Sequence, residues 1–343
     1  MMNPKILSIG ISNPVEKFSQ EEVYDLLGYR NDKIKSIFLN SEIEYRHFYV
    51  DRKKTKQPES LNQLHERYLQ GSLDLCQRAT HDAISKTSFS PQDIDFVAAV
   101  SCTGYLCPAL STRLVHSLRM NNNVQQANIL GMGCSGAMPG MQRVFDHLNA
   151  HPDHIGLLVC VEICSAAYFI DNSLETIVGN AICGDGAAAL LLGNNSEIPG
   201  PRIIDFETLI APEHIDKVGF DYDSGRLKII LKKEIPDLAA PYVNRAIEQI
   251  LERNRLKKED IKYWIVHSGG RKVLDQFKEK LHLTEQHIKH SRSILRKYGN
   301  MSSPTVLFVL KEIWEKEKPS KDEIGIMIAL GPGLSVEGCL LQW

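Results

Sequence analysis

Apolar residues return every three or four positions in several long stretches of the chain. This spacing predicts helices over residues 61–86, 109–119, 136–149, 236–256 and 303–317. Short, continuous apolar runs such as "FVAAV" and "YWIV" lie between these stretches and predict buried strands. The segment "SQEE" has the spacing of a capping box and predicts one more helix start. Strands that alternate with helices predict a layered α/β fold with largely parallel sheets.

An internal repeat divides the chain. The segment "FSPQDIDFVAAVSCTG" and the later segment "RLKKEDIKYWIVHSGG" share one plan: a polar lead, Asp-Ile, an apolar run and small residues. Ile94 and Ile261 are 261 − 94 = 167 positions apart in this alignment. A period this long predicts a domain duplication, because solenoid repeats are only about 20–50 residues long. We therefore expect two halves of similar fold, residues 1–195 and 196–343.

Charge and composition exclude several function classes. The 343 residues include 40 Lys and Arg against 42 Asp and Glu, so no excess positive charge favours nucleic acid or an anionic membrane as a partner. The first residues lack the features of a signal peptide, and the longest apolar stretch, 155–170, is interrupted by Glu162 and is too short for a membrane span. We expect a cytoplasmic protein with eight reduced cysteines and, without paired CxxC spacing, no zinc site.

Three polar residues are candidates for catalysis. Cys134 lies among small residues in "GMGCSGAMPG", at a predicted helix start where the helix dipole favours a thiolate. The repeat places Asn300 in the equivalent loop, and we expect both residues to follow a strand and precede a helix. His267 ends a predicted strand, where open α/β sheets place their sites. We interpret Cys134 as a nucleophile, His267 as its base or ion-pair partner, and Asn300 as a hydrogen-bond donor to an oxyanion.

Each of these residues also has a purely structural interpretation. Cys134 alone is typical of a buried apolar position, His267 of a core histidine, and Asn300 of a helix cap. The repeat favours the joint interpretation because it relates the loops that carry them. The remaining histidines in two groups are expected to be solvated rather than to bind a metal, because metal ligands usually need a buried second layer of partners. These histidines are His147, His151, His154, His282, His287 and His290.

Four separated motifs carry a family resemblance. The segments "MGCSGA", "WIVHSGG", "YGNMSSPTVLFVL" and "GPGLSVE" resemble, in this order, motifs of the type III polyketide synthases, the chalcone synthase-like branch of the thiolase superfamily. The resemblance implies a duplicated αβαβα five-layer core, a homodimer, and coenzyme A thioesters as substrates with no metal or other cofactor. Cys134 would then carry the growing chain as a thioester, while His267 and Asn300 would hold the malonyl-CoA carbonyl and stabilise the enolate formed on decarboxylation.

Two shorter segments narrow the resemblance. "VHSGGRKVLD" and "VEICSAAYF" are similar to bacterial 3,5-dihydroxyphenylacetyl-CoA synthases, which implies malonyl-CoA as both starter and extender. At the two positions where plant enzymes have bulky phenylalanine gatekeepers, this chain has Cys183 and Ile229, so a differently shaped passage is expected. Cys107 stands where a plant methionine reaches into the partner subunit. The resemblance implies these substrate-binding residues: Cys102, Thr103, Cys107, Cys164, Ala167, Gly179, Cys183, Ile229, Ser302, Gly331, Pro332 and Gly333.

The basic residues that hold coenzyme A in the family are only partly present. Lys33 matches one of them, whereas Ser36 and Asn40 stand at two others, so Lys35 or Arg46 is expected to compensate. This departure leaves an acyl carrier protein open as an alternative partner. Three other functions also stay open: a single-condensation ketosynthase that joins two acyl chains to a pyrone, a non-catalytic partner subunit of thiolase fold, and a thioesterase.

Overall fold

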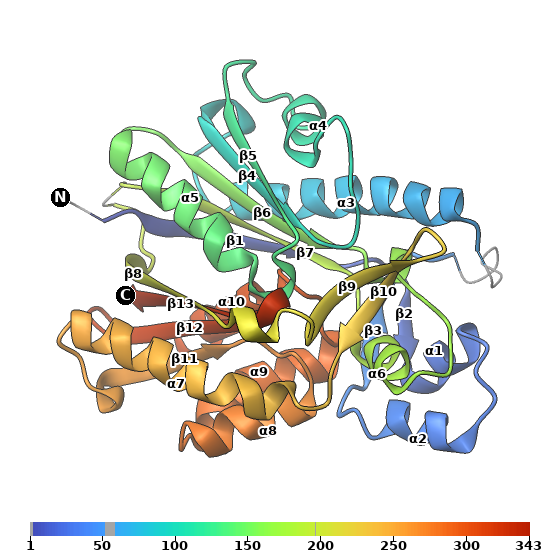
Figure 1. The fold of residues 1–343 in the computed structure, drawn as a ribbon. Helices are drawn as coiled ribbons and strands as arrows, with labels where there is room; N and C mark the ends of the chain where they lie inside the picture. The colour runs from blue at the N-terminus through green and yellow to red at the C-terminus, as the bar shows by residue number, and fades with distance from the viewer. Residues whose placement is uncertain (1–2, 52–58, 196) are drawn as a thin grey trace.

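The computed structural model describes residues 3–51, 59–195 and 197–343. In these residues nine strands form one mixed sheet (Figure 1). Two antiparallel pairs, β2 (Lys17–Ser19) with β3 (Tyr45–His47) and the hairpin of β9 (Val218–Asp223) with β10 (Arg226–Leu231), lie outside it. The nine strands in spatial order are β11 (Ile261–Val266), β12 (Ile324–Gly331), β13 (Ser335–Gln342), β8 (Arg202–Ile210), β1 (Lys5–Ser12), β7 (Gly186–Gly193), β6 (Gly156–Glu162), β4 (Phe96–Ser101) and β5 (Gln125–Leu130).

The helices of the structure confirm the predictions made from the apolar periodicity. All five predicted stretches are helical, and their ends agree to within three residues. The capping box is also confirmed, because the Ser19 hydroxyl accepts from the Glu22 amide at the start of the first helix. The helices are α1 (Gln20–Leu26), α2 (Asp32–Leu39), α3 (Leu61–Ile84), α4 (Leu110–Ser117), α5 (Ala137–Ala150), α6 (Leu174–Ile182), α7 (Ile235–Arg253), α8 (Arg271–Lys280), α9 (Glu285–Tyr298) and α10 (Thr305–Glu317).

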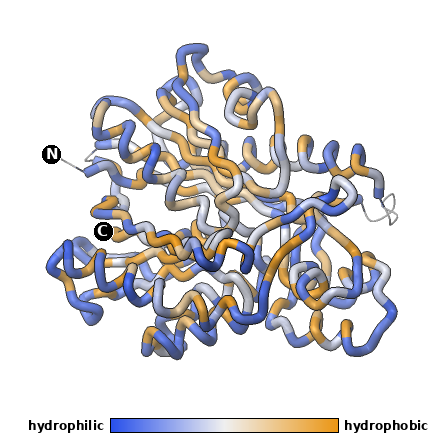
Figure 2. Tube along the Cα trace, viewed as in Figure 1, coloured by the Kyte–Doolittle hydropathy of each residue, from blue (hydrophilic) through white to orange (hydrophobic). Residues whose placement is uncertain are grey.

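The two halves of the sheet and three layers of helices stack as five layers. Helices α5 and α10 lie between the halves, α3 covers the outer face of the N-terminal half, and α7 and α9 cover that of the C-terminal half (Figure 1). The central core takes residues from both halves, including Met138 of α5 and Phe308 of α10. Apolar segments accordingly concentrate in the strands and polar segments on the outer helix faces (Figure 2). Within the sheet, the strands of the two halves pair at one position, where Lys5 of β1 is opposite Arg202 of β8.

Two expectations about this fold are wrong. The sheet is not largely parallel: β4 pairs in parallel with β5 and β6, and β11 with β12, but the other five pairings are antiparallel. The three residues between β12 and β13 are too few for the crossover that a parallel pair needs. Asn300 also follows helix α9 rather than a strand, because the apolar residues before it repeat with helical spacing.

Candidate active site

Cys134 lies in a tight turn, Gly133–Ser135, that leads directly into α5. The backbone of Gly133 has a positive φ of 50°, and a Cβ there would lie 2.6 Å from Cδ of Pro332. The Ser135 hydroxyl donates to the Met132 carbonyl at 3.0 Å and lies 3.2 Å from the hydroxyl of Ser335. The loop between β12 and β13 therefore packs directly on the turn that carries Cys134. Glycine is required at 133 by both the backbone angle and this contact.

Asn300 brings the second half of the chain to this thiol. Its Nδ2 lies 3.8 Å from Sγ of Cys134, and its Oδ1 lies 3.9 Å from the same sulfur. Oδ1 also accepts from the Ser302 amide at 2.8 Å, while Nδ2 donates to the Gly269 carbonyl at 3.4 Å. These bonds fix the amide with its N–H group facing the sulfur. The structure therefore places the first and last of the three candidates in direct contact.

His267 lies next to this pair without a hydrogen bond to either member. It follows β11, and its backbone amide donates to the Ile328 carbonyl of β12 at 2.9 Å. The residue is only 3% exposed, yet neither ring nitrogen has a hydrogen-bond partner among the described residues. A Cβ built on Gly269 would lie 3.6 Å from its Nε2, so the ring adjoins the glycine whose carbonyl binds Asn300. A buried imidazole with two unused nitrogens is available to a substrate.

Burial opposes the thiolate that the helix dipole favours at Cys134. Burial raises the pKa of Cys134 to about 12, although hydrogen bonds from Ser302 and Asn300 oppose the shift. Burial also lowers the pKa of His267 to about 4. Desolvation disfavours the charged form of both groups. In the structure the site therefore holds a neutral thiol and a neutral imidazole.

A cavity contains several of the residues that the resemblance implied. Strands β9 and β10 lie over α6 beside this cavity (Figure 1). Ile229 of β10 packs on α6 so closely that a Cβ on Gly179 would lie 2.9 Å from its side chain. Lys228 secures the hairpin through a 2.8 Å ion pair with Asp171. The lining residues are Thr103, Cys164, Ala167, Tyr168, Phe169, Thr176, Gly179, Asn180, Cys183, Phe220 and Ile229.

The other implied residues lie outside the lining of this cavity. The Cys102 thiol lies 3.5 Å from the Ser302 hydroxyl, which follows Asn300 in sequence. Cys107 is exposed and precedes Pro108 through a cis peptide bond. The remaining three residues form the loop that packs on the Cys134 turn: Gly331, Pro332 and Gly333.

Glu162 is a further residue at this site, and the sequence reasoning assigned it no role. It is fully buried at the end of β6, and its Oε2 accepts from the amides of Cys102 at 2.9 Å and Thr103 at 3.1 Å. Its Oε1 accepts from the Ser303 hydroxyl at 2.7 Å. The carboxylate thus ties the loop after β4 to the loop that presents Asn300. In the sequence, the sign of this role was that Glu162 is a single charged residue inside a long apolar run.

Of the two residues expected to compensate for missing coenzyme A contacts, Arg46 is not available to do so. Arg46 is fully buried, and its guanidinium donates to the backbone carbonyls of Asn180 at 2.6 Å and Cys183 at 2.8 Å. Lys35 forms a 2.8 Å ion pair with Glu21. Lys33 is exposed in the first turn of α2 and has no ion pair within the described residues. The expectation for Arg46 fails because its side chain packs inward between Phe38 and Phe48.

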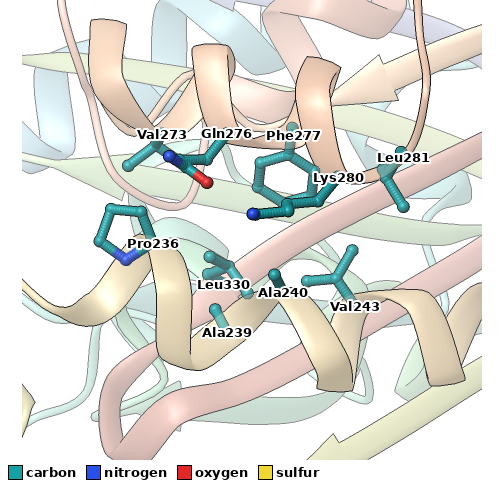
Figure 3. Close-up of a pocket in the computed structure, with 10 residues that line it drawn as sticks. All are labelled: Pro236, Ala239, Ala240, Val243, Val273, Gln276, Phe277, Lys280, Leu281 and Leu330. Carbon is teal, nitrogen blue, oxygen red and sulfur yellow. The ribbon is translucent and has the colours of Figure 1, made fainter.

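Outside this site the described residues offer little chemistry. A mostly apolar groove between α7 and α8, floored by Leu330, has Gln276 and Lys280 as its polar lining residues (Figure 3). No three His, Cys, Asp or Glu side chains converge as metal ligands in the described ranges. The expectation of solvation is wrong for His290, which is buried between Glu312 and Glu317 because α9 packs on α10. None of the described helices is both long and apolar enough to cross a membrane.

Comparisons with known proteins agree with this geometry. The family model described as "FAE1/Type III polyketide synthase-like protein" matches residues 34–201, and "Chalcone and stilbene synthases, C-terminal domain" matches residues 210–343. The 3,5-dihydroxyphenylacetyl-CoA synthase of Streptomyces toyocaensis is 32% identical, over 99% of this chain and 90% of its own. The 1,3,6,8-tetrahydroxynaphthalene synthase of Streptomyces peucetius is 27% identical, over 98% of this chain and 93% of its own.

Solved structures share the fold over the whole chain. The C-terminal type III polyketide synthase domain of "Steely1" from Dictyostelium superposes with a TM-score of 0.92 at 25% identity, covering 99% of each chain. The duplicated five-layer arrangement is therefore the thiolase fold, as the motifs implied. With both family models, a full-length relative above 30% identity and a thiol facing an amide from the other half of the sheet, this chain belongs to the type III polyketide synthases, the acyltransferases of the chalcone and stilbene synthase family.

Proposed function

We propose that this enzyme uses malonyl-CoA as both starter and extender, condenses it onto an acyl thioester held on Cys134, and forms a 3,5-dihydroxyphenylacetyl-type aromatic product. One observation carries the assignment of the residues: the Asn300 amide faces the Cys134 sulfur at 3.8 Å beside the buried, unpartnered His267. The malonyl-primed product is supported by the 32% identity to a 3,5-dihydroxyphenylacetyl-CoA synthase over the full chain.

Acyl loading begins with the neutral pair. The Cys134 sulfur attacks the thioester carbonyl, its proton passes to His267, and coenzyme A leaves as a thiol after accepting that proton. Each charge stabilises the other while both exist, which offsets the burial that keeps them neutral at rest. His267 can accept the proton at neutral pH because its pKa is lowered to about 4 and the ring is therefore unprotonated.

Chain extension uses the same residues as hydrogen-bond donors. The N–H groups of His267 and Asn300 hold the thioester oxygen of malonyl-CoA while the bond to the carboxylate breaks, releasing carbon dioxide and leaving an enolate. The enolate carbon then attacks the acyl carbon on Cys134, and the Cys134 sulfur leaves as a thiolate, which takes a proton from solvent to restore the thiol. A new carbon–carbon bond forms, and the chain, now on coenzyme A, is two carbons longer.

The lining of the cavity combines polar and small side chains. Hydroxyl, thiol and amide groups contribute to it, from Thr103, Thr176 and Asn180 as well as two cysteines. Small residues such as Gly179 and Ala167 leave the remaining space to the chain.

We also infer that the enzyme is a homodimer with coenzyme A, rather than an acyl carrier protein, as its carrier. Strand β5 is an edge of the sheet, and Leu130 at its end is 49% exposed. Tyr105, in the loop between β4 and α4, is 66% exposed. A second copy would cover this apolar edge. Light scattering of the purified protein tests this inference, and a monomeric mass would contradict it.

The function is tested with malonyl-CoA alone. We expect release of carbon dioxide, a product built from several malonyl units, and a mass increase on the Cys134 peptide. Cys134→Ala should abolish all three, whereas Cys76→Ala, which removes a buried thiol in α3, should retain them. Full turnover by Cys134→Ala would refute the nucleophile. Acylation of Cys134 only by other acyl-CoA donors would refute malonyl priming, and no acylation by any donor would favour a non-catalytic subunit.

A further inference from the structure

Two exposed cations at the start of α8 have no carboxylate partner. Arg271 and Lys272 are the first two residues of the helix, and within the described part of the chain neither side chain forms an ion pair or a hydrogen bond. On the neighbouring helix, by contrast, Arg292 contacts three separate carboxylates. The two cations are therefore left without a structural role by the fold around them.

Their position is unfavourable for helix stability alone. The N-terminal end of a helix carries partial positive charge, so cations there are disfavoured and carboxylates are preferred. The first turn of α8 has no acidic residue. Gly270, the residue before it, has a φ of 145° and no side chain to cap the free amides. This end of the helix is therefore suited to bind an anion, since its first N–H groups are uncapped and the helix dipole is positive there. The two cations do not stabilise the helix itself.

This helix end adjoins the candidate active site. Asn300 donates to the carbonyl of Gly269, two residues before α8 begins. The His267 ring lies against the same glycine. A Cβ built on Gly269 would lie 3.6 Å from the His267 Nε2 and 3.6 Å from Val273 in the first turn of α8. His267 is 3% exposed with both ring nitrogens unpartnered, so a buried polar group that lacks a ligand faces the loop leading to these cations.

We propose that Arg271 and Lys272, with the free amides of α8, bind the phosphates of coenzyme A. Coenzyme A carries its phosphates at one end of a long, neutral pantetheine arm and the reacting thioester at the other. The arm would run from Asn300 and His267 across Gly269 to α8. This inference rests on the proposed function in taking coenzyme A as the carrier. It supplies the cations that the chain lacks on α2, where Lys33 alone matches the family.

The test measures binding, so it does not depend on turnover. Coenzyme A and pantetheine, which lacks the phosphates, are each titrated by calorimetry into wild type and the double variant Arg271→Glu/Lys272→Glu at physiological ionic strength. The matched control is Lys280→Glu, an exposed lysine of α8 eight residues from Lys272, about 12 Å along the helix axis and beyond the screening length at physiological salt.

We expect the double variant to weaken coenzyme A binding roughly tenfold or more, as for loss of a charge-assisted contact, while pantetheine binding stays unchanged. Lys280→Glu should leave both affinities as in wild type. Added salt should weaken coenzyme A binding in wild type more than in the double variant. Unchanged coenzyme A affinity in the double variant would overturn the proposal, as would an equal loss for pantetheine. Coenzyme A binding that depends on these residues without any product would instead refute the proposed function alone.

Discussion

Replacing Glu162 by Ala should destabilise the enzyme strongly, although Glu162 lies outside the reacting groups. The carboxylate is fully buried and accepts from two backbone amides, those of Cys102 and Thr103, at 2.9 and 3.1 Å. The Thr103 hydroxyl also donates to it at 2.9 Å, and the Ser303 hydroxyl at 2.7 Å. The hydroxyls can turn to other acceptors, but the amides cannot.

The magnitude follows from these two amides. Each buried N–H without a partner costs about 1–3 kcal/mol, so the Ala variant loses about 2–6 kcal/mol. Relief of the buried charge offsets part of this loss, because burial raises the pKa of Glu162 against its hydrogen bonds. We therefore expect the free energy of unfolding to fall by about 3 kcal/mol. Glu162→Gln keeps an oxygen acceptor and should lose about 1 kcal/mol, the difference between a charged and a neutral acceptor.

Urea unfolding followed by circular dichroism measures both variants. The Ala variant should also lose condensation activity, because the loop with Asn300 is then no longer tied to the loop after β4. Glu162→Gln serves as the control for volume and shape. A loss below about 1 kcal/mol in the Ala variant would refute the argument, since it would mean that the two amides find other partners or water.

Four further changes test the site. Gly133→Ala should lower activity and cost about 1–2 kcal/mol in urea unfolding, because the new Cβ meets Pro332 at 2.6 Å and φ is positive; wild-type rates would contradict this. Alkylation of Cys134 by iodoacetamide should quicken about tenfold per pH unit from pH 7 to 9, since its pKa is raised to about 12; a pH-independent rate would indicate a resting thiolate. The pKa of His267 is lowered to about 4, so only the unfolded state gains its proton as pH falls from about 6.5 to 4. Stability should drop by about 3 kcal/mol over that range, and His267→Gln should remove this part of the slope. Cys183→Phe should shorten or redirect products in mass spectrometry, and an unchanged profile would show that Cys183 is not a gatekeeper.

Local sequence patterns predicted the helices and the loop of Cys134 well. Helical spacing of apolar residues and a capping box depend on neighbours within a few positions, so the ends of α3 and α5 could be read directly. The internal repeat also related the loop of Cys134 to that of Asn300, and the two side chains do meet in the folded chain. The repeat could not show that α9 precedes Asn300, because the matched segments diverge there.

What the sequence by itself determined is which residues could carry the chemistry and where the helices that present them begin. Only the tertiary structure decided the state of those residues, because burial comes from segments far apart in the chain. Desolvation opposes the thiolate that the helix dipole favours at Cys134. Packing turns Arg46 inward and leaves Arg271 outside without a partner among the described residues, although both are simply arginines in the sequence. Glu162, one charge in an apolar run, gains its role only when two distant loops bring their donors to it.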